Sequence, residues 1–368
     1  MNHIHFIPAG DENTASSRLR VYSLAESLEA RGVAVSIGAG IPDAAAVVAV
    51  QKRVTPDILA QVAQAKARGA LVVYDVDDSG NALWYWSPPR LCKEMLGLAH
   101  VVTVDTQARA EWLHRAFRGL RVFVCPNAID YAPTQSAGAE PVEHSPLRVF
   151  WFGSVGTLVM FRRHAEALAA LPDVRVVVCS GITSLTDEIR DQLRVEIVPW
   201  TRQGFVGALQ GCDISCLMHD GTADDRRKSN HKMITSICWG VPAIVSDTPE
   251  YRRTAIEAGV QDAVFGNAEE LLQVVERFRC AAARRRYLAS AQPHVWQSYA
   301  PEHIADRFVG VIAEAEELIS ESSTRGGTAK GRLAKFVAYL QWRWHLEDDH
   351  HALIWNWMKG ITRIGLKV

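Results

Sequence analysis

The stretch DISCLMHDGTADDRRKSNHKMITSICWGVPAIVSDTPEYR, residues 213–252, indicates how this chain folds. Its two short apolar runs, 213–219 and 242–247, have the length of strands. Between them, apolar residues around Met233 and Ile237 recur at helical spacing. A strand, a helix and a second strand in this order form the repeating unit of a parallel sheet. The stretch therefore predicts an α/β domain.

The same alternation extends over most of the chain. Apolar runs without polar alternation imply strands that helices cover on both faces, and we expect one long helix at 18–31 between the first two runs. The strand candidates are 4–8, 33–38, 47–50, 71–76, 101–104 and 122–125, followed by 147–154, 174–181 and 195–200. The pattern predicts two doubly wound, Rossmann-like domains that face each other across a cleft.

The domain boundaries follow from composition. Residues 131–146 are rich in proline and small residues and nearly lack apolar ones, which is typical of an interdomain linker. The expected parts are a first Rossmann-like domain at 1–135, a linker at 136–146, a second Rossmann-like domain at 147–300, a helix at 301–322 that can return to the first domain, and a helical tail at 323–368.

Composition also limits the partners. The chain has 368 residues, 48% of them hydrophobic and 22% charged, and its formal net charge of −1 does not favour a nucleic-acid partner. The amino terminus shows no signal-peptide pattern, and no run of about 18 apolar residues occurs. We therefore expect a cytoplasmic protein, which can lie at the inner face of the membrane.

The tail has a composition of its own. It holds four of the eleven tryptophans and more basic than acidic residues, with Leu333, Phe336 and Leu340 at helical spacing. One interpretation is an amphipathic helix that binds an anionic membrane surface. The other is a helix pair that docks on this protein or on another subunit. Both interpretations stay open.

A cationic loop precedes the predicted helix of the opening stretch. Lys228, Ser229, Asn230 and Lys232 lie where the chain enters that helix. Free backbone N–H groups and the helix dipole favour an anion at such a position, and Ser229 or Asn230 suits the N-cap. The alternative is a solvated basic turn with an ordinary cap.

These residues carry a resemblance to a known family. The Lys-Ser loop, the helix, Gly240-x-Pro242 and the following strand resemble the donor-binding region of GT-B glycosyltransferases similar to the retaining glycosyl transferases group 1 superfamily. The turn Pro126-Asn127-x-Ile129-Asp130 and the run LRVFWFGSVGT at 147–157 resemble the same family. The resemblance implies a GT-B fold, with the acceptor in the first domain and the nucleotide-sugar donor in the second.

The resemblance also assigns residues to the donor. It implies that Lys228 and Ser229 contact the diphosphate or the sugar, with Asn230 and Lys232 close by. The remaining donor-side residues that it implies are Gly153, Ser154 and Trp200. His219 follows a predicted strand and can lie near the donor sugar. Thr235 stands where many members have a glutamate that binds the ribose, and Arg227 occupies the paired acidic position. This departure leaves a changed donor or a loss of activity open. Trp200 can instead cover the edge of the core, and His219 can be an ordinary loop histidine.

A second polar cluster follows the run LVVY. Asp75, Asp77 and Asp78 lie at the carboxyl end of a predicted strand and invite comparison with the metal-binding Asp-x-Asp motif of the GT-A class. Because the lysines near residue 230 already supply positive charge, we expect neither a metal nor a cofactor. In that case Asp77 or Asp78 binds acceptor hydroxyls or acts as a base. A solvated helix N-cap is the alternative.

The start of the first helix contributes two cations. Arg18 and Arg20 follow a polar loop at 10–17 and can meet an anion on the acceptor side, although a surface-helix role is equally common. The resemblance thus implies transfer of a hexosyl unit, with retention, from a nucleoside diphosphate sugar to a hydroxyl acceptor. We expect Asp77, Asp78 and Lys228 to be the catalytic residues. The basic tail suggests a lipid-linked glycan acceptor and bacterial surface glycan synthesis. A non-catalytic scaffold, or an epimerase or hydrolase that needs no acceptor, is the alternative.

Overall fold

The computed structural model describes residues 3–79, 83, 86–117, 119–131, 143–154, 157, 161, 166–181 and 195–324. The chain divides into two compact units. Among the described residues, the first unit contains those up to Ala128 together with 301–324, and the second runs from Ile129 to Ala300. The second unit thus begins before residue 135, where we expected the first domain to end. The expected tail lies outside the described residues from 325 on, as does most of the expected linker.

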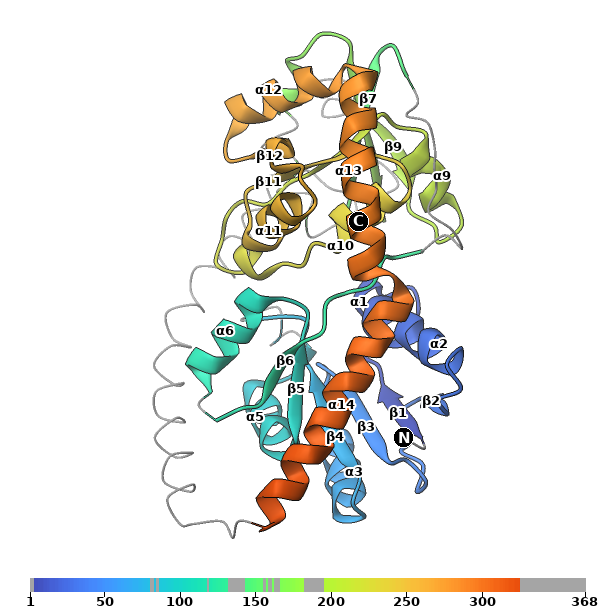
Figure 1. Cartoon of the computed structure of the whole chain (residues 1–368), viewed down its shortest axis with the longest axis vertical. Coiled ribbons are helices and arrows are strands. Elements are labelled where there is room, and N and C mark those ends of the chain that lie inside the picture. Colours follow the sequence, from blue (N-terminus) through green and yellow to red (C-terminus); the bar gives the residue numbers. More distant parts are fainter. Residues whose placement is uncertain are drawn as a thin grey trace. The chain divides into compact units, whose positions relative to one another are not determined.

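The first unit is built on a parallel six-stranded sheet (Figure 1). Its order is β2-β1-β3-β4-β5-β6, and Val48 of β3 lies opposite Val72 of β4. The strands are β1 (Ile4–Ile7), β2 (Val35–Ile37), β3 (Val47–Gln51), β4 (Leu71–Asp75), β5 (Val101–Val104) and β6 (Val122–Val124). Every strand that the sequence predicted in this half is present.

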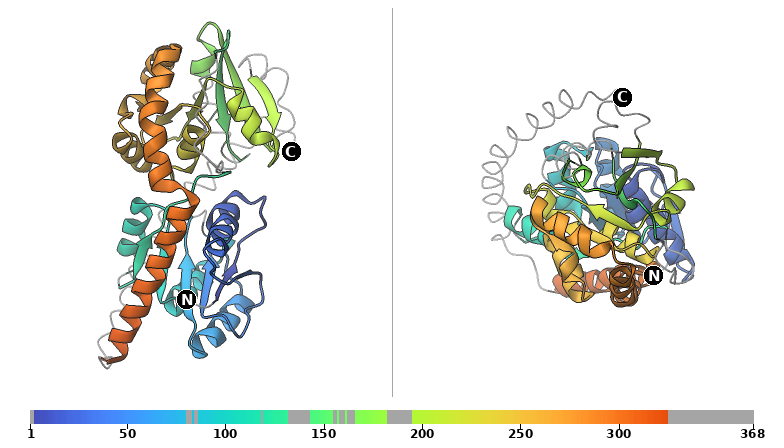
Figure 2. Two further views of the ribbon diagram at one scale, coloured as in Figure 1. Left: turned by 45° about the vertical axis from the view of Figure 1, so that its right-hand side comes forward. Right: turned by 90° about the horizontal axis from the view of Figure 1, so that it is seen from above.

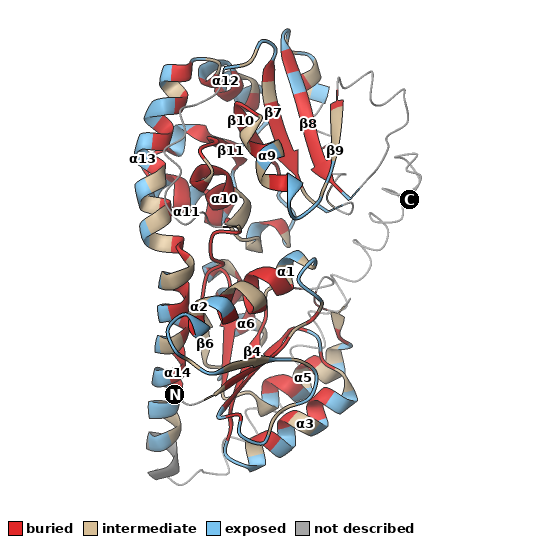
Figure 3. Ribbon diagram, turned by 90° about the vertical axis from the view of Figure 1, so that its right-hand side faces the viewer, coloured by how far each residue is buried: buried red, intermediate tan, exposed pale blue. Residues whose placement is uncertain are grey.

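The two faces of this sheet bury alternate side chains, as the pleat of a strand requires. Val47 and Val73 belong to the apolar cluster on one face, and Val48, Val72 and Tyr74 belong to the cluster on the other. The inner strands β1, β3, β4 and β5 are buried and the edge strands β2 and β6 only partly so, while the covering helices expose one side to solvent (Figure 3). Burial on both faces explains why these strands read as continuous apolar runs.

The helices of the first unit begin at recognisable signals. Thr55 and Thr106 accept hydrogen bonds from the N–H groups of Ile58 and Arg109 and so cap two of them. The helices are α1 (Ala15–Ser17), η1 (Arg18–Tyr22), α2 (Ser23–Glu29), α3 (Pro56–Ala67), α5 (Pro89–Leu98), α6 (Gln107–Ala116) and α14 (Pro301–Thr324). The single helix expected at 18–31 is wrong in detail, because η1 is a π-helical segment between two α-helical ones.

The long helix α14 packs on the first unit, although it follows the second unit in the chain (Figures 1 and 2). Ile304, Phe308 and Ile312 join the apolar cluster that contains β1 and α2. The rings of Phe308 and Phe6 lie 5.8 Å apart. One face of the first sheet is therefore closed by residues from both ends of the described chain.

The second unit contains another parallel six-stranded sheet. Its order, β9-β8-β7-β10-β11-β12, is that of a Rossmann fold, with the two halves diverging from β7 and β10. The strands are β7 (Leu147–Phe152), β8 (Val174–Ser180), β9 (Val195–Pro199), β10 (Ile214–Leu217), β11 (Ala243–Ser246) and β12 (Val264–Phe265). The sequence predicted all of them except β12, which is two residues long.

One continuous apolar core holds the second unit together. Its helices are α9 (Gly204–Gln210), η3 (Asp225–Arg227), α10 (His231–Cys238), α11 (Pro249–Glu257), η4 (Gln261–Ala263), α12 (Ala268–Phe278) and α13 (Ala281–Tyr299). Met233, Ile234 and Ile237 of α10 are fully buried, as their spacing predicted. In the described part of the chain, no helix combines the length and the apolar character that crossing a membrane requires.

Candidate functional site

Each sheet gathers polar side chains at the carboxyl ends of its strands. In the first sheet β1 lies between β2 and β3, so the strand order reverses there. The carboxyl ends of β1 and β3 therefore form the topological switch point, where ligands bind in folds of this kind. The Gln51 carboxamide joins the two ends, because its Oε1 accepts hydrogen bonds from the Ala9 N–H at 3.0 Å and the Ser17 hydroxyl at 2.8 Å. Gln51 therefore fixes the start of α1 against β3.

Lys52, the residue after β3, occupies the centre of this edge. Its φ of 27° is unusual for a residue with a side chain and marks local backbone strain. The Lys52 Nζ lies 2.6 Å from Asp78 Oδ2 and 3.2 Å from Asp77 Oδ1, and it donates to the Ser16 hydroxyl at 2.9 Å. The ring of Trp86 lies 4.8 Å from the ammonium. The two predicted catalytic carboxylates thus share one buried cation.

The ionisation of this cluster is perturbed. Burial, the largest cause, raises the pKa of Asp77 to about 6, although the Lys52 charge opposes the rise. The neighbouring carboxylates of Asp78, Asp75 and Asp105 add to it. Burial would lower the pKa of Lys52, but the charges of Asp77 and Asp78 raise it above its ordinary value. Lys52 is therefore a permanent cation, whereas Asp77 changes charge close to neutral pH.

Two further ion pairs lie beside the Lys52 cluster. Arg20 Nη2 lies 2.5 Å from Asp75 Oδ1, and Arg109 Nε lies 2.6 Å from Asp105 Oδ1. The Thr103 hydroxyl donates to the same Asp75 oxygen at 2.7 Å. All four charged side chains are nearly inaccessible to solvent. Each of these pairs joins one cation to one carboxylate, whereas Lys52 contacts both Asp77 and Asp78.

The structure changes the interpretation of the two predicted arginines. Arg20 also donates to the Cys125 carbonyl at 2.5 Å and to Asn127 Oδ1 at 3.2 Å, and it is buried inside the unit. Direct contact between Arg20 and an acceptor anion, which the sequence suggested, would require these bonds to break. Arg18 is buried as well and donates to the Glu12 carbonyl at 3.1 Å. Both side chains order the first unit, and neither has the exposed placement that we expected.

In the second unit, the loop after β7 begins with Gly153. A Cβ on this residue would lie 2.5 Å from the Thr157 hydroxyl and 2.9 Å from the Trp151 ring, so a larger residue would have to displace these side chains. The Ser154 carbonyl accepts from the N–H and the hydroxyl of Thr157, and Ser154 itself is exposed. This loop stands at β7, one of the two strands that form the switch point of the second sheet.

Lys228 and Lys232 form a pair of cations at the start of α10. Neither lysine has an ion pair with a carboxylate in the part of the chain that the structure describes. Instead, Lys232 Nζ lies 5.6 Å from the centre of the Trp151 ring and 5.5 Å from that of Phe152. Burial lowers the pKa of Lys232 to about 8, and the charge of Lys228 contributes. Two neighbouring cations without a counter-ion favour binding of an anion.

His219 follows β10, on the other side of the switch point. Its backbone N–H donates to the Ser246 hydroxyl at 2.9 Å, and the centre of its ring lies 5.4 Å from that of the Tyr251 ring. Nδ1 lies 3.4 Å from Asp225 Oδ1. Burial, the largest cause, lowers the pKa of His219, although Asp225 opposes the shift. His219 is therefore a neutral imidazole at pH 7, held next to the Lys228 loop.

The other predicted donor residues have structural contacts. The Thr235 hydroxyl accepts a hydrogen bond from the Asp130 N–H at 3.2 Å and is buried, so it anchors the turn that begins the second unit. Asn230 stands at the N-cap of α10 but donates to the Thr254 hydroxyl at 2.8 Å, which means that its side chain does not cap the helix as we expected. Ser229 contacts His231 at 3.0 Å, and Trp200 packs partly buried against the core.

The structure gives a physical test of the metal alternative. The Lys52 ammonium lies between Asp77 and Asp78, which is the position that a divalent ion would take in an Asp-x-Asp site. No group of three or more His, Cys, Asp or Glu side chains among the described residues is arranged to hold a metal. The first observation favours a site in which lysine supplies the charge; metal independence itself stays a prediction.

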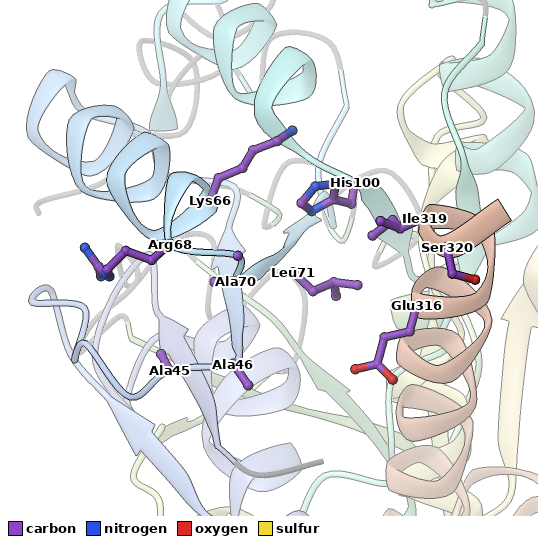
Figure 4. Close-up of a pocket in the computed structure, with 11 residues that line it drawn as sticks. Ala45, Ala46, Lys66, Arg68, Ala70, Leu71, His100, Glu316, Ile319 and Ser320 are labelled. Atoms are coloured by element: carbon purple, nitrogen blue, oxygen red, sulfur yellow. The ribbon is translucent and has the colours of Figure 1, made fainter. Parts of the chain in front are cut away.

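Sequence reasoning missed Gln51 and Lys52. Gln51 ends β3 and Lys52 follows it, and this position at the carboxyl end of a strand is the one that drew attention to Asp75 at the end of β4. That position was the available signal. A cavity of about 520 Å³ lies at the opposite, amino-terminal edge of the first sheet, where Lys66, His100 and Glu316 are among its lining residues (Figure 4). None of the predicted site residues lines it.

Comparisons with known proteins agree on the fold. The structure of HepE from Anabaena in complex with UDP and glucose is similar at a TM-score of 0.61 and 15% identity, over 85% of this chain and 100% of that one. A glycosyltransferase from Rickettsia africae matches at a TM-score of 0.59 and 12% identity, over 85% and 98% of the two chains. TarM matches at 0.54 and 12%, but the match spans only 57% of TarM and 78% of this chain.

A protein from Listeria monocytogenes named for a UDP-N-acetylglucosamine 2-epimerase also matches, at a TM-score of 0.51 and 14% identity, over 86% and 96% of the chains. No protein-family model and no curated protein matches the sequence. Together with the two parallel sheets, these similarities confirm the expected fold class: the chain has the GT-B fold.

Proposed function

We propose that this protein is a glycosyltransferase that moves a hexosyl unit from a nucleoside diphosphate sugar to a hydroxyl acceptor without a metal or other cofactor. The observation that carries the proposal is the pair Lys228 and Lys232, two neighbouring cations without a carboxylate partner in the described residues. A diphosphate would supply the missing negative charge. Burial and the charge of Lys228 lower the pKa of Lys232, and a bound anion would oppose both effects.

The chemistry divides between the two units. In the second, the lysines neutralise the diphosphate as its bond to the anomeric carbon breaks, which is electrostatic stabilisation of a leaving group. In the first, Asp77 or Asp78 accepts a hydrogen bond from the acceptor hydroxyl and takes its proton as the hydroxyl oxygen forms the new bond to the anomeric carbon. The family resemblance of the sequence supports retention of configuration. It also assigns Gly153, Ser154, Trp200, Ser229 and Asn230 to the donor, and we expect His219 to lie near the donor sugar.

The solved neighbours support the donor class. HepE was solved in complex with UDP and glucose, and two other neighbours are named as a glycosyltransferase and an O-GlcNAc transferase. We extend this to a nucleotide-sugar donor in the present chain. The basic, tryptophan-rich tail supports a lipid-linked glycan acceptor, a location at the inner face of the membrane and a role in bacterial surface glycan synthesis.

Two observations favour a second candidate function. The neighbour from Listeria named for an epimerase shares the fold, and an enzyme of that kind, or a hydrolase, would act on the nucleotide sugar without an acceptor. Thr235 is engaged by the Asp130 N–H, in a place where many relatives have a ribose-binding glutamate. A chain that has lost donor chemistry would serve as a non-catalytic scaffold.

A thermal-shift titration with UDP, GDP, dTDP, CMP and their sugars tests the proposal, on the wild type and Lys228→Ala, with and without EDTA. A ligand at about 100 times its Kd adds about 2.7 kcal/mol of stability. We expect one nucleotide to raise the Tm of the wild type, unaffected by EDTA, and to have a much smaller effect on Lys228→Ala. If no nucleotide changes the Tm, the scaffold function gains support; product analysis with the active donor separates transfer from epimerisation or hydrolysis.

A further inference from the structure

The Lys52 cluster assigns different places to the two carboxylates of the acceptor side. Asp77 has 7% of its side chain exposed and Asp78 has 16%, while Lys52 has 2%. The shorter contact, 2.6 Å, joins Lys52 to the more exposed carboxylate, Asp78. The outer member of the cluster is therefore Asp78, and Lys52 and Asp77 lie behind it.

Lys52 is itself held from several directions. Its carbonyl accepts hydrogen bonds from the hydroxyls of Tyr74 and Ser87, both at 3.0 Å, and its ammonium binds Ser16 at the start of α1. The strained backbone at φ 27° persists because these contacts fix it. A lysine that is fixed at both its backbone and its ammonium has one orientation. Its ammonium therefore fixes the positions of the Asp77 and Asp78 carboxylates that it contacts.

We propose that Lys52 is a positioning residue for the acceptor side: its ammonium holds Asp78 in place at the carboxyl edge of the first sheet, with Asp77 behind it. In this arrangement Lys52 supplies the fixed positive charge that a divalent ion supplies in an Asp-x-Asp site. Asp78 contacts the acceptor, whereas Lys52 and Asp77 act through Asp78. The inference rests on the proposed function for the identity of the ligand, but its geometry does not.

The charges around Asp77 set what the test will measure. Lys52 is the cation that lowers the pKa of Asp77, against burial and the neighbouring carboxylates. An opposite charge at this distance lowers a carboxyl pKa by about 1–3. The ionisable groups that surround the cluster are Asp75 and Tyr74 on β4, Asp78 after β4, Asp105 after β5, Arg109 on α6 and Lys52 after β3. Lys52 and Arg109 are the cations among them, and Lys52 is the larger of the causes that lower the pKa of Asp77, so its removal should raise that pKa.

The experiment is a carboxyl-carbon NMR titration of the full chain labelled at aspartate, from pH 4 to 9, with Asp77→Asn to assign the signal. In the wild type we expect Asp77 to titrate near pH 6. In Lys52→Met the midpoint should rise by at least about one pH unit. The control Lys66→Met removes a half-buried lysine that donates to the Leu98 carbonyl at the opposite edge of the sheet, and it should leave the midpoint unchanged. An unchanged midpoint in folded Lys52→Met would overturn the proposal.

A second measurement covers the case in which Lys52→Met does not fold. The side-chain carbon signals of lysine in the wild type should include one that moves as Asp77 titrates, and that step should vanish in Asp77→Asn. Absence of any such lysine signal in the wild type would overturn the proposal as well. Neither measurement needs a donor or an acceptor, so both give a result even if the nucleotide titration fails.

Discussion

Replacement of Lys232 by methionine should stabilise the unbound protein and remove its response to nucleotide. The pKa of Lys232 falls from 10.5 to about 8 on folding because of burial and the charge of Lys228. Each pH unit between the two values is worth about 1.4 kcal/mol, which sets an upper limit of about 3 kcal/mol on the destabilisation at pH 7. Solvent access to the half-buried side chain reduces the expected gain in Lys232→Met to about 1–3 kcal/mol. A methionine can also pack against the Trp151 and Phe152 rings.

The sign of the pH dependence follows from the same two values. Between about pH 8 and 10.5 the unfolded chain keeps the Lys232 proton and the folded chain has lost it. The free energy of unfolding therefore rises with pH over that range in the wild type, and the advantage of Lys232→Met disappears. Affinity for a nucleoside diphosphate should fall over the same range, because the cation that binds the phosphate is lost.

Urea unfolding of the full chain at pH 7 and pH 10, with and without the nucleotide that stabilises the wild type, measures both effects. Lys66→Met is the matched control, since its ammonium has a carbonyl partner and its loss should not stabilise the chain. The reasoning is refuted if Lys232→Met is no more stable than the wild type at pH 7, or if it responds to nucleotide as the wild type does.

Three further predictions concern the described residues of each unit. Arg20→Met leaves Asp75 buried without its cation and should lower the free energy of unfolding by roughly 3–5 kcal/mol in urea melts; a loss below about 1 kcal/mol contradicts the assigned network. Because the folded pKa of Asp77 is raised to about 6, its protonated form stabilises the fold, and this contribution is lost as pH rises from 3.8 to about 6. The free energy of unfolding of Asp77→Asn, minus that of the wild type, should therefore be about 1–3 kcal/mol larger at pH 7 than at pH 4. If the two proteins show the same pH dependence of stability, Asp77 does not titrate as proposed. Gly153→Ala should displace the Trp151 ring at a cost of about 1–3 kcal/mol and weaken nucleotide-induced stabilisation; an unaffected nucleotide response would separate Gly153 from the donor site.

The sequence predicted the two sheets because buried parallel strands consist of continuous apolar runs. It missed β12, whose two residues are too few to form such a run. It also missed the π-helical segment η1, from which Arg20 reaches Asp75, a residue far away in the chain. Local patterns contain no information about that contact.

The sequence likewise predicted only part of the candidate site. Asp77 and Asp78 were found because they end a strand, and the Lys228 loop because it precedes a helix. Lys52 could not be assigned to the carboxylates, because the pairing of β3 with β4 and the register that places Gln51 opposite Asp75 depend on the three-dimensional fold. Burial, which raises the pKa of Asp77 and lowers that of Lys232, likewise depends on tertiary packing.

The return of α14 to the first unit has a consequence for biosynthesis. While the ribosome is still making the second unit, the face of the first sheet that includes Phe6 and Val47 lacks the helix that will cover it. The nascent first unit therefore presents an apolar surface until Phe308 and Ile312 have been synthesised. A chaperone that recognises apolar surface would bind there, and packing of α14 on the sheet would displace it.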